Sequence, residues 1–269
     1  MKSEIAGPVA QTNGSGASLA RYYARLFRQA GYSVAKGLAL PFVRREAVRS
    51  GLHTPAYPSW ASYAPWLKDE RFQAVYRRVR RNTLVDEYRC WELWTLVDEL
   101  IDVPGSIIEV GVWRGGTGAL MAARAQDLAI EQPVYLCDTW AGVVKAGDED
   151  AYYSGGEHSD TSLETVRSLV ERLGLHNVEL LKGIFPDETA EGVTTDSVRL
   201  CHIDVDVYRG AAEIFDWVWP RLSPGGVVVF DDYGGSATVG VARFVDEQRM
   251  QTDRLVVHNL NGHALIIKR

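Results

Sequence analysis

The chain of 269 residues is 46% hydrophobic and 24% charged, long enough for one catalytic domain of conventional size with an N-terminal extension. The formal net charge of −6 is uneven, because residues 1–90 carry 15 Lys and Arg against 6 Asp and Glu while the remainder is acidic. No nucleic-acid recognition motif accompanies the basic part, so we expect no nucleic-acid partner, and packing on the acidic domain or on another subunit of a homo-oligomer instead.

The N-terminal part of the chain predicts an extension without a targeting or membrane segment. Residues 1–17 are polar, contain Gly and Ser and lack the order of a signal peptide, so we expect a disordered tail on a cytoplasmic protein. Residues 18–90 show an Arg-rich helical pattern whose GLALPFV run is far too short to span a bilayer. The main domain is therefore expected at residues 91–269. Three cysteines without CxxC spacing argue against a zinc site or a disulfide framework.

The segment GSIIEVGVWRGGTGALMAARAQ predicts a strand, a glycine-containing loop and a helix. The strand ends in Glu109, and Gly111 and Gly115 allow a tight turn and close backbone approach to a ligand. Trp113 stands where GxGxxG has its second glycine, which weakens a pyrophosphate interpretation. A strand-end acid before such a loop suits a ligand with cationic groups, such as the sulfonium and amino groups of S-adenosylmethionine (SAM).

The next two predicted strands add candidate cofactor contacts. PVYLCD ends in Asp138, where a Rossmann-like fold has the acid that accepts hydrogen bonds from ribose hydroxyls, although an Asp after a strand also often caps a helix. HNVELLKGIFPD follows, and its Gly183 and Phe185 are placed to line an adenine pocket, with a core role for Phe185 equally open. Between them, residues 141–160 predict either a lid or a plain surface insertion. His158 in that segment is a candidate base or a solvated loop residue.

Four carboxylates follow two short apolar runs further along the chain. HIDVD supplies Asp204 and Asp206, and VVVFDD supplies Asp231 and Asp232. The carboxyl ends of parallel strands form the ligand-binding edge of an open sheet, and oxygen ligands on rigid elements suit Mg²⁺. Without a cation these charges would repel and raise one another's pKa values. Solvated loop acids are the alternative for an isolated DxD, but the second pair favours a metal site. His202 is expected to pack within its strand.

The last segments predict how the sheet ends. VGVARFVDEQRM has a helical pattern, and Asn261-Gly262 between the apolar runs of RLVVHNLNGHALIIK is a strong hairpin signal. A mostly parallel sheet that ends in an antiparallel hairpin is typical of Rossmann-like class I SAM-dependent methyltransferases, and dehydrogenases usually lack it. The expected fold class is therefore α/β of this kind, with a helical N-terminal extension.

From about Thr83 to Arg269 the sequence resembles the macrocin and mycinamicin III O-methyltransferases and the related novobiocin sugar methyltransferase. The likeness is carried, in order, by EVGVWRGGTGALMA, CDTWAGV, ERLGLHNVELLKGIFPD, HIDVDVY and LSPGGVVVFDDYG. Two departures are DVD in place of the family's DGD, and DTWAG in place of DSFEG. Both keep the aspartates Asp138, Asp204 and Asp206, so they bear on the acceptor pocket more than on the metal or the cofactor.

The resemblance implies an Mg²⁺- and SAM-dependent enzyme that methylates a hydroxyl of a sugar on a glycosylated natural product. It implies Mg²⁺ at Asp204, Asp231 and Asp232, with Asp204 also as base, while Asp206 could hydrogen-bond the acceptor. SAM would contact the matching positions Thr83, Glu109, Gly111, Val112, Trp113, Gly115, Asp138, Gly183 and Phe185.

Two other functions remain open from the sequence. An NAD-dependent sugar-modifying enzyme would use the same loop and Asp138, but would leave the Asp231–Asp232 pair and the hairpin unexplained. A non-catalytic SAM-binding or assembly module would use the acids as turn caps and the basic extension to hold partners.

Overall fold

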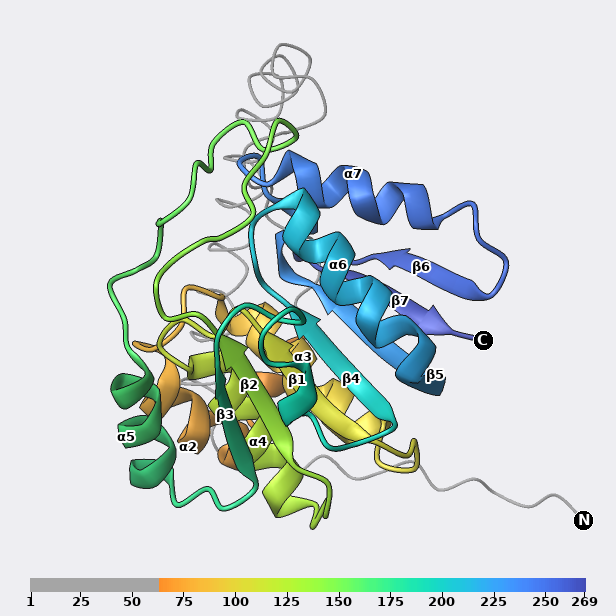
Figure 1. The fold of residues 1–269 in the computed structure, drawn as a ribbon. Helices are drawn as coiled ribbons and strands as arrows, with labels where there is room; N and C mark the ends of the chain where they lie inside the picture. The colour runs from red at the N-terminus through yellow and green to blue at the C-terminus, as the bar shows by residue number, and fades with distance from the viewer. Residues whose placement is uncertain (1–62) are drawn as a thin grey trace, which may run out of the picture. The chain divides into compact units, whose positions relative to one another are not determined.

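A seven-stranded sheet forms the centre of the molecule in the computed structural model, which describes residues 63–269 (Figure 1). The strand order is β3-β2-β1-β4-β5-β7-β6, and the pairs from β3 to β5 are parallel. The strands are β1 (Ser106–Val110), β2 (Val134–Asp138), β3 (Val178–Lys182), β4 (Val198–Ile203), β5 (Leu222–Phe230), β6 (Arg254–His258) and β7 (Ala264–Lys268). The chain order reverses between β1 and β4, which is where open α/β sheets bind their ligands.

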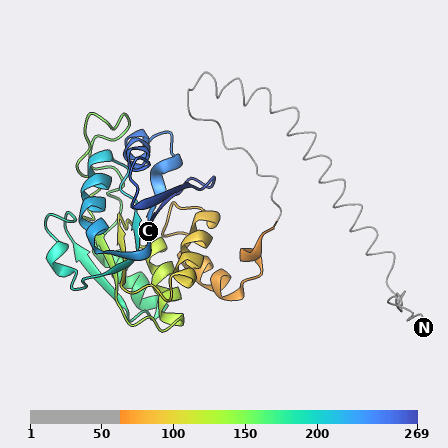
Figure 2. The same cartoon turned by 90° about the vertical axis from the view of Figure 1, so that its right-hand side faces the viewer.

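Helices cover both faces of this sheet (Figure 2). They are α2 (Glu70–Val79), α3 (Glu87–Glu99), α4 (Gly116–Asp127), α5 (Leu163–Leu173), α6 (Tyr208–Val218) and α7 (Val239–Gln248), with 3-10 turns η1 (Pro65–Leu67), η2 (Ala190–Gly192), η3 (Trp219–Arg221) and η4 (Asp231–Gly234). Alternate residues of a strand face opposite sides, so Ile107 packs in the core beneath α2–α5 while Ile108 packs in the core beneath α6 and α7. Burial on both faces explains the continuous apolar runs in the sequence.

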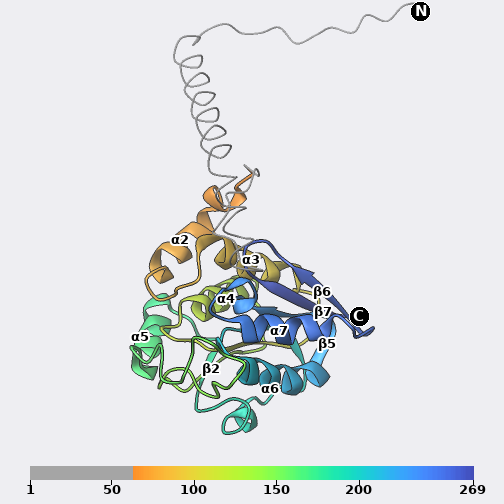
Figure 3. The ribbon, with the colours of Figure 1, turned by 90° about the horizontal axis from the view of Figure 1, so that it is seen from above.

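The sheet ends in an antiparallel hairpin. β7 pairs antiparallel with β5 and β6 pairs with β7, and the hairpin lies at the edge of the sheet opposite α5 (Figure 3). Its turn is closed by the Gly262 amide, which donates to the Asn259 carbonyl oxygen, and Gly262 has a φ of 113° that suits glycine. The predicted fold class, an α/β Rossmann-like domain with a mostly parallel sheet and a C-terminal antiparallel hairpin, is therefore confirmed.

The described part of the N-terminal extension belongs to the same compact unit as the sheet, which runs from Tyr63 to Arg269. In α2, Phe72, Val75 and Val79 recur at helical spacing and are buried, so this helix packs as a covering layer. The domain start expected at residue 91 falls inside α3. The expected tail at residues 1–17, and the extension as far as residue 62, lie outside the described residues. Within residues 63–269, no helix is long and apolar enough to cross a bilayer.

Candidate active site

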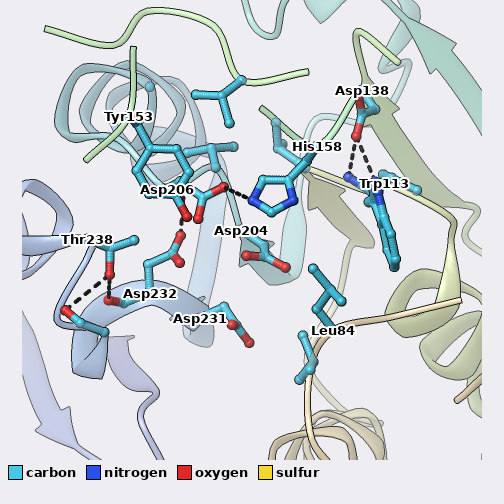
Figure 4. A pocket seen from close by; sticks show the side chains of 18 of the residues that line it. Leu84, Trp113, Asp138, Tyr153, His158, Asp204, Asp206, Asp231, Asp232 and Thr238 are labelled. Atoms are coloured by element: carbon cyan, nitrogen blue, oxygen red, sulfur yellow. Dashed lines mark hydrogen bonds and ion pairs between the residues drawn. The ribbon is translucent and has the colours of Figure 1, made fainter. Parts of the chain in front are cut away.

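A cavity of about 510 Å³ opens at the carboxyl ends of the central strands (Figure 4). Most of the sequence-predicted site residues line it: Thr83, Gly111, Val112, Trp113, Asp138, Gly183, Phe185, Asp204, Asp206, Asp231 and Asp232. The register explains this meeting. Val110 pairs with Ile203 and Ile203 pairs with Phe230, so the next residue of each strand leaves the sheet beside its neighbour.

Two of the predicted cofactor residues do not line the cavity. Glu109 is fully buried, with its side chain on the α4 face of the sheet, where its Oε1 lies 2.9 Å from Nδ1 of His202. Gly115 is the N-cap of α4 with a φ of 86°, and a Cβ there would contact Val166. Glu109 and Gly115 therefore lie in the packed structure beneath the loop and do not form the cavity wall.

The glycine loop is held against the ends of two neighbouring strands. Gly111 has a φ of 89°, and a Cβ at this position would overlap the carbonyl oxygen of Asp204. The Asp138 carboxylate accepts hydrogen bonds from the amides of Val112 at 2.6 Å and Trp113 at 2.8 Å, and its other oxygen accepts from the Trp140 amide at 2.6 Å. Asp138 therefore fixes the shape of the loop that follows β1.

Trp113 connects this loop to the segment at residues 141–160, which borders the cavity. Its indole donates a hydrogen bond to Asp160 at 2.8 Å, and its carbonyl oxygen accepts from the Thr161 hydroxyl at 2.6 Å. Further along the segment, the buried Asp150 carboxylate accepts from the Tyr208 amide at the start of α6. The segment is thus attached on both sides of the cavity, where its Tyr153 and His158 line the wall.

Asp204, Asp231 and Asp232 converge at the inner end of the cavity, each with a carboxylate oxygen within 4.8 Å of the others. Burial, followed by repulsion from Asp231 and Asp232, holds the pKa of Asp204 well above its ordinary value. Burial and the neighbouring acids raise the pKa of Asp232 in the same way. The negative charges of these carboxylates therefore repel one another. The sequence analysis predicted such repulsion, with raised pKa values, for these acids in the absence of a cation.

Asp206 lies toward the segment at residues 141–160 (Figure 4). Its amide donates to the Asp232 carboxylate at 2.8 Å, and its own carboxylate lies 4.0 Å from Nε2 of His158. Burial and a hydrogen bond to Asp206 raise the pKa of the Tyr153 hydroxyl. Asp204, Asp206 and Tyr153 all line the cavity.

Asp231 has three basic neighbours that sequence reasoning did not connect with it. The Arg89 guanidinium on α3 forms an ion pair with Oδ2, and His263 Nε2 lies 2.8 Å from Oδ1. His202, which was expected only to pack, has its Nε2 3.6 Å from the same Oδ1. Although burial raises the pKa of Asp231, its contacts with the two imidazoles lower it well below its usual range. No local motif marks Arg89 or His263, since each comes from a distant segment.

The donor set fits a hard divalent cation. Three carboxylates provide only oxygen ligands, at the ends of rigid strands, and their mutual repulsion favours a positive ion between them. The contacts of Asp231 do not prevent this, because each carboxylate oxygen has a second lone pair available.

The doubly wound sheet, the cavity at its reversal point and the terminal hairpin define the fold of class I SAM-dependent methyltransferases. Within that class, residues 56–261 match the family model of the macrocin-O-methyltransferases (TylF), so the chain belongs to this family.

Individual relatives agree with this assignment. The 8-demethyl-8-(2,3-dimethoxy-α-L-rhamnosyl)-tetracenomycin-C 4'-O-methyltransferase of Streptomyces olivaceus is 36% identical over 142 residues, which are 49% of this chain and 54% of that protein. The mycinamicin III 3''-O-methyltransferase of Micromonospora griseorubida is 33% identical over 147 residues, 49% of this chain and 56% of that protein. The match thus spans little more than half the length of these curated relatives. Among solved structures, the O-methyltransferase NovP has a TM-score of 0.61 at 24% identity, covering 70% of this chain and 82% of that one, and shows the shared fold.

Proposed function

We propose that this protein is an Mg²⁺-dependent O-methyltransferase that transfers a methyl group from SAM to a hydroxyl of a sugar on a natural product. The observation that carries the proposal is the meeting of three carboxylates, Asp204, Asp231 and Asp232, with the glycine loop at one end of a single cavity. Family membership supports methyl transfer, and the printed activities of the relatives, which act on glycosylated tetracenomycin and mycinamicin, support a sugar acceptor.

SAM would lie along the loop from Gly111 to Trp113 and supply the electrophilic methyl group. Thr83, Gly183 and Phe185 also line the cavity and would contact the nucleoside. Asp138 would serve this site in two ways, because it holds the loop amides and also faces the cavity. Glu109 would act from beneath the loop without touching the ligand, since its buried side chain faces α4 and does not line the cavity.

Asp204, Asp231 and Asp232 would hold Mg²⁺, which when bound would lower the pKa of an acceptor hydroxyl. Asp204 would accept the proton of that hydroxyl, because it lines the cavity and, unlike Asp231, has no basic side chain hydrogen-bonded to it. Asp206, held by the Tyr153 hydroxyl, would hydrogen-bond the acceptor and orient it. Positioning both reactants in one enclosed space would supply much of the remaining acceleration.

The partners that follow from this proposal are glycosylated small molecules. We also infer a homo-oligomer, and light scattering after size-exclusion chromatography tests that part separately.

The proposed function is tested by transfer of a labelled methyl group from SAM to a panel of rhamnosylated and otherwise glycosylated antibiotics, with the corresponding aglycones as controls. We expect labelled product with glycosides and none with aglycones. Titration of the protein with SAM and with NAD in a calorimeter separates the alternatives, because NAD binding without SAM binding would contradict the proposal.

A further inference from the structure

Two buried imidazoles and one carboxylate meet beside the three-acid cluster. His263 Nε2 lies 2.8 Å from Asp231 Oδ1, and His202 Nε2 lies 3.6 Å from the same oxygen. One ligand atom of each of these three residues lies within 4.8 Å of the other two. All three side chains are buried, and the two histidines are fully so. The group is therefore a compact N₂O donor set, distinct in chemistry from the all-oxygen set of Asp204, Asp231 and Asp232.

The second nitrogen of each imidazole is bonded to a carboxylate. His202 Nδ1 lies 2.9 Å from Glu109 Oε1, and His263 Nδ1 lies 2.6 Å from Glu92 Oε2. A carboxylate that accepts the Nδ1 proton leaves Nε2, which faces Asp231, as the nitrogen that can bind a metal once its own proton is released. Histidines that bind metals almost always donate their other ring N–H to a carboxylate, a backbone carbonyl or a water.

His202 Nε2 is a fully buried polar atom without a hydrogen-bond partner. This ring nitrogen faces Asp231 and could bind a cation held between the imidazole and the carboxylate. The charges around the site also favour a bound cation. Glu92, Glu109 and Asp231 are three negative groups, and Arg89 is the one cation that contacts them among residues 63–269 apart from the histidines themselves. A divalent cation that displaced the protons of the two imidazoles would balance this group.

We propose that His202, His263 and Asp231 form a second metal site, which takes a borderline divalent transition metal such as Zn²⁺. Ligands about 2.0–2.1 Å from a tetrahedral zinc lie roughly 3.3 Å apart, and the observed separations of 2.8 and 3.6 Å bracket that value. Three protein ligands leave the fourth position open, as in catalytic zinc sites. Imidazole nitrogen favours zinc over magnesium, so the two sites select different ions.

The site does not rest on the proposed methyl transfer, but it shares Asp231 with the proposed Mg²⁺ set. A transition metal held by the two histidines would therefore draw Asp231 away from Asp204 and Asp232. The expected consequence is regulation by inhibition, in which zinc binding at the histidines weakens Mg²⁺ binding at the acids.

The test uses the full chain without an affinity tag, with Co²⁺ as a spectroscopic probe and Zn²⁺ in a calorimeter. Four- or five-coordinate Co²⁺ with imidazole ligands absorbs strongly in the visible range, whereas octahedral Co²⁺ among oxygens absorbs weakly. We expect the parent protein to give the strong band with one Co²⁺ per chain, and Zn²⁺ to abolish it.

Variants separate the two sites. Glu92→Gln should weaken Zn²⁺ binding by about 10–100-fold, the usual effect of an outer partner, and His263→Gln and His202→Gln should weaken it more. His258→Gln is the matched control, because His258 is an exposed histidine on β6 that packs on Tyr233. The double variant Asp204→Asn, Asp232→Asn should lose Mg²⁺ binding and keep the Co²⁺ band.

Absence of the strong band in the parent protein would overturn the proposal, and so would Zn²⁺ affinity unchanged in His263→Gln. Loss of the band in the Asp204→Asn, Asp232→Asn variant would assign the ion to the acids instead. Each variant is checked by thermal unfolding, and if His202→Gln does not fold, His263→Gln and Glu92→Gln decide the matter. If the protein gives the strong band but needs no Mg²⁺ for turnover, the proposed magnesium mechanism is rejected and the second metal site is retained.

Discussion

The amide of Trp113 donates a hydrogen bond to the carboxylate of Asp138 at 2.8 Å, which joins the loop after β1 to the end of β2. The same carboxylate oxygen accepts from Val112, so the loop is shaped by a charged acceptor before any ligand is bound. An acid at this position therefore affects cofactor binding even where it makes no direct contact with the cofactor.

Replacement of Asp138 by Ala should weaken SAM binding and also lower the melting temperature. The substitution removes the charged acceptor of three backbone amides. Hydrogen bonds to charged groups contribute about 1.5–3 kcal/mol each. We therefore expect SAM affinity to fall about 10- to 100-fold for each of these bonds that supports SAM binding. Calorimetry with SAM and thermal unfolding measure the two effects. Asp127→Ala, which removes a surface acid paired with Arg71, is the control. Weaker binding at an unchanged melting temperature would favour ribose contact alone, and an unchanged dissociation constant would reject both roles.

Asp204→Asn should lose far more turnover than Asp206→Asn while SAM affinity stays nearly constant. The amide retains one oxygen for a metal but cannot accept a proton, and loss of a general base typically lowers the rate by about 10²–10⁴-fold. Added Mg²⁺ should therefore not restore the rate. Single-turnover measurements with both variants decide the assignment. If Asp204→Asn remains within a few-fold of the parent while Asp206→Asn is inactive, Asp206 is the base.

Chelation should abolish methyl transfer, and added Mg²⁺ should restore it. Without a cation, burial and mutual repulsion keep the pKa values of Asp204 and Asp232 high. The two carboxyl groups then tend to hold protons of their own, and nothing lowers the pKa of the acceptor hydroxyl. Activity is measured after exhaustive treatment with EDTA and again after Mg²⁺ is returned, with Ca²⁺ as a comparison of equal charge. Full activity in the chelated protein would exclude the metal mechanism.

Gly111→Ala should destabilise the protein by more than Gly174→Ala. Both glycines have positive φ, at 89° and 70°, and a left-handed backbone costs an alanine roughly 1–2 kcal/mol. A Cβ at Gly111 would also overlap the carbonyl oxygen of Asp204, whereas nothing lies within 4 Å of a Cβ at Gly174. Overpacking adds about 1–3 kcal/mol at Gly111 alone. Urea unfolding of both variants measures the difference in free energy, and equal losses would show that the loop can move away from β4.

The sequence predicted the fold and the meeting of the acids because both follow from local patterns. Asp204 and Asp231 come directly after short apolar strands, and parallel strands bring their carboxyl ends to one edge. The direction of a side chain depends on alternation within the strand, however. Glu109 was expected to contact SAM, and its buried side chain faces α4 and does not line the cavity.

The partners of Asp231 could not be predicted in this way. Arg89 and Glu92 lie on a helix before the first strand, and His263 lies in the last loop of the chain. Their meeting depends on how α3 packs beside the hairpin, and helix packing leaves no motif at a fixed spacing. A histidine after an Asn-Gly turn reads as a solvated residue, although here it is fully buried.

The segment at residues 141–160 crosses the cavity that the two halves of the sheet form beneath it. The glycine loop and Asp138 come from strands before this segment, and the three acids come from strands after it. The wall of the cavity and its floor are thus encoded in separate stretches of the gene. Changes confined to the segment would alter the wall formed by Tyr153 and His158 while leaving the three acids and Asp138 unchanged.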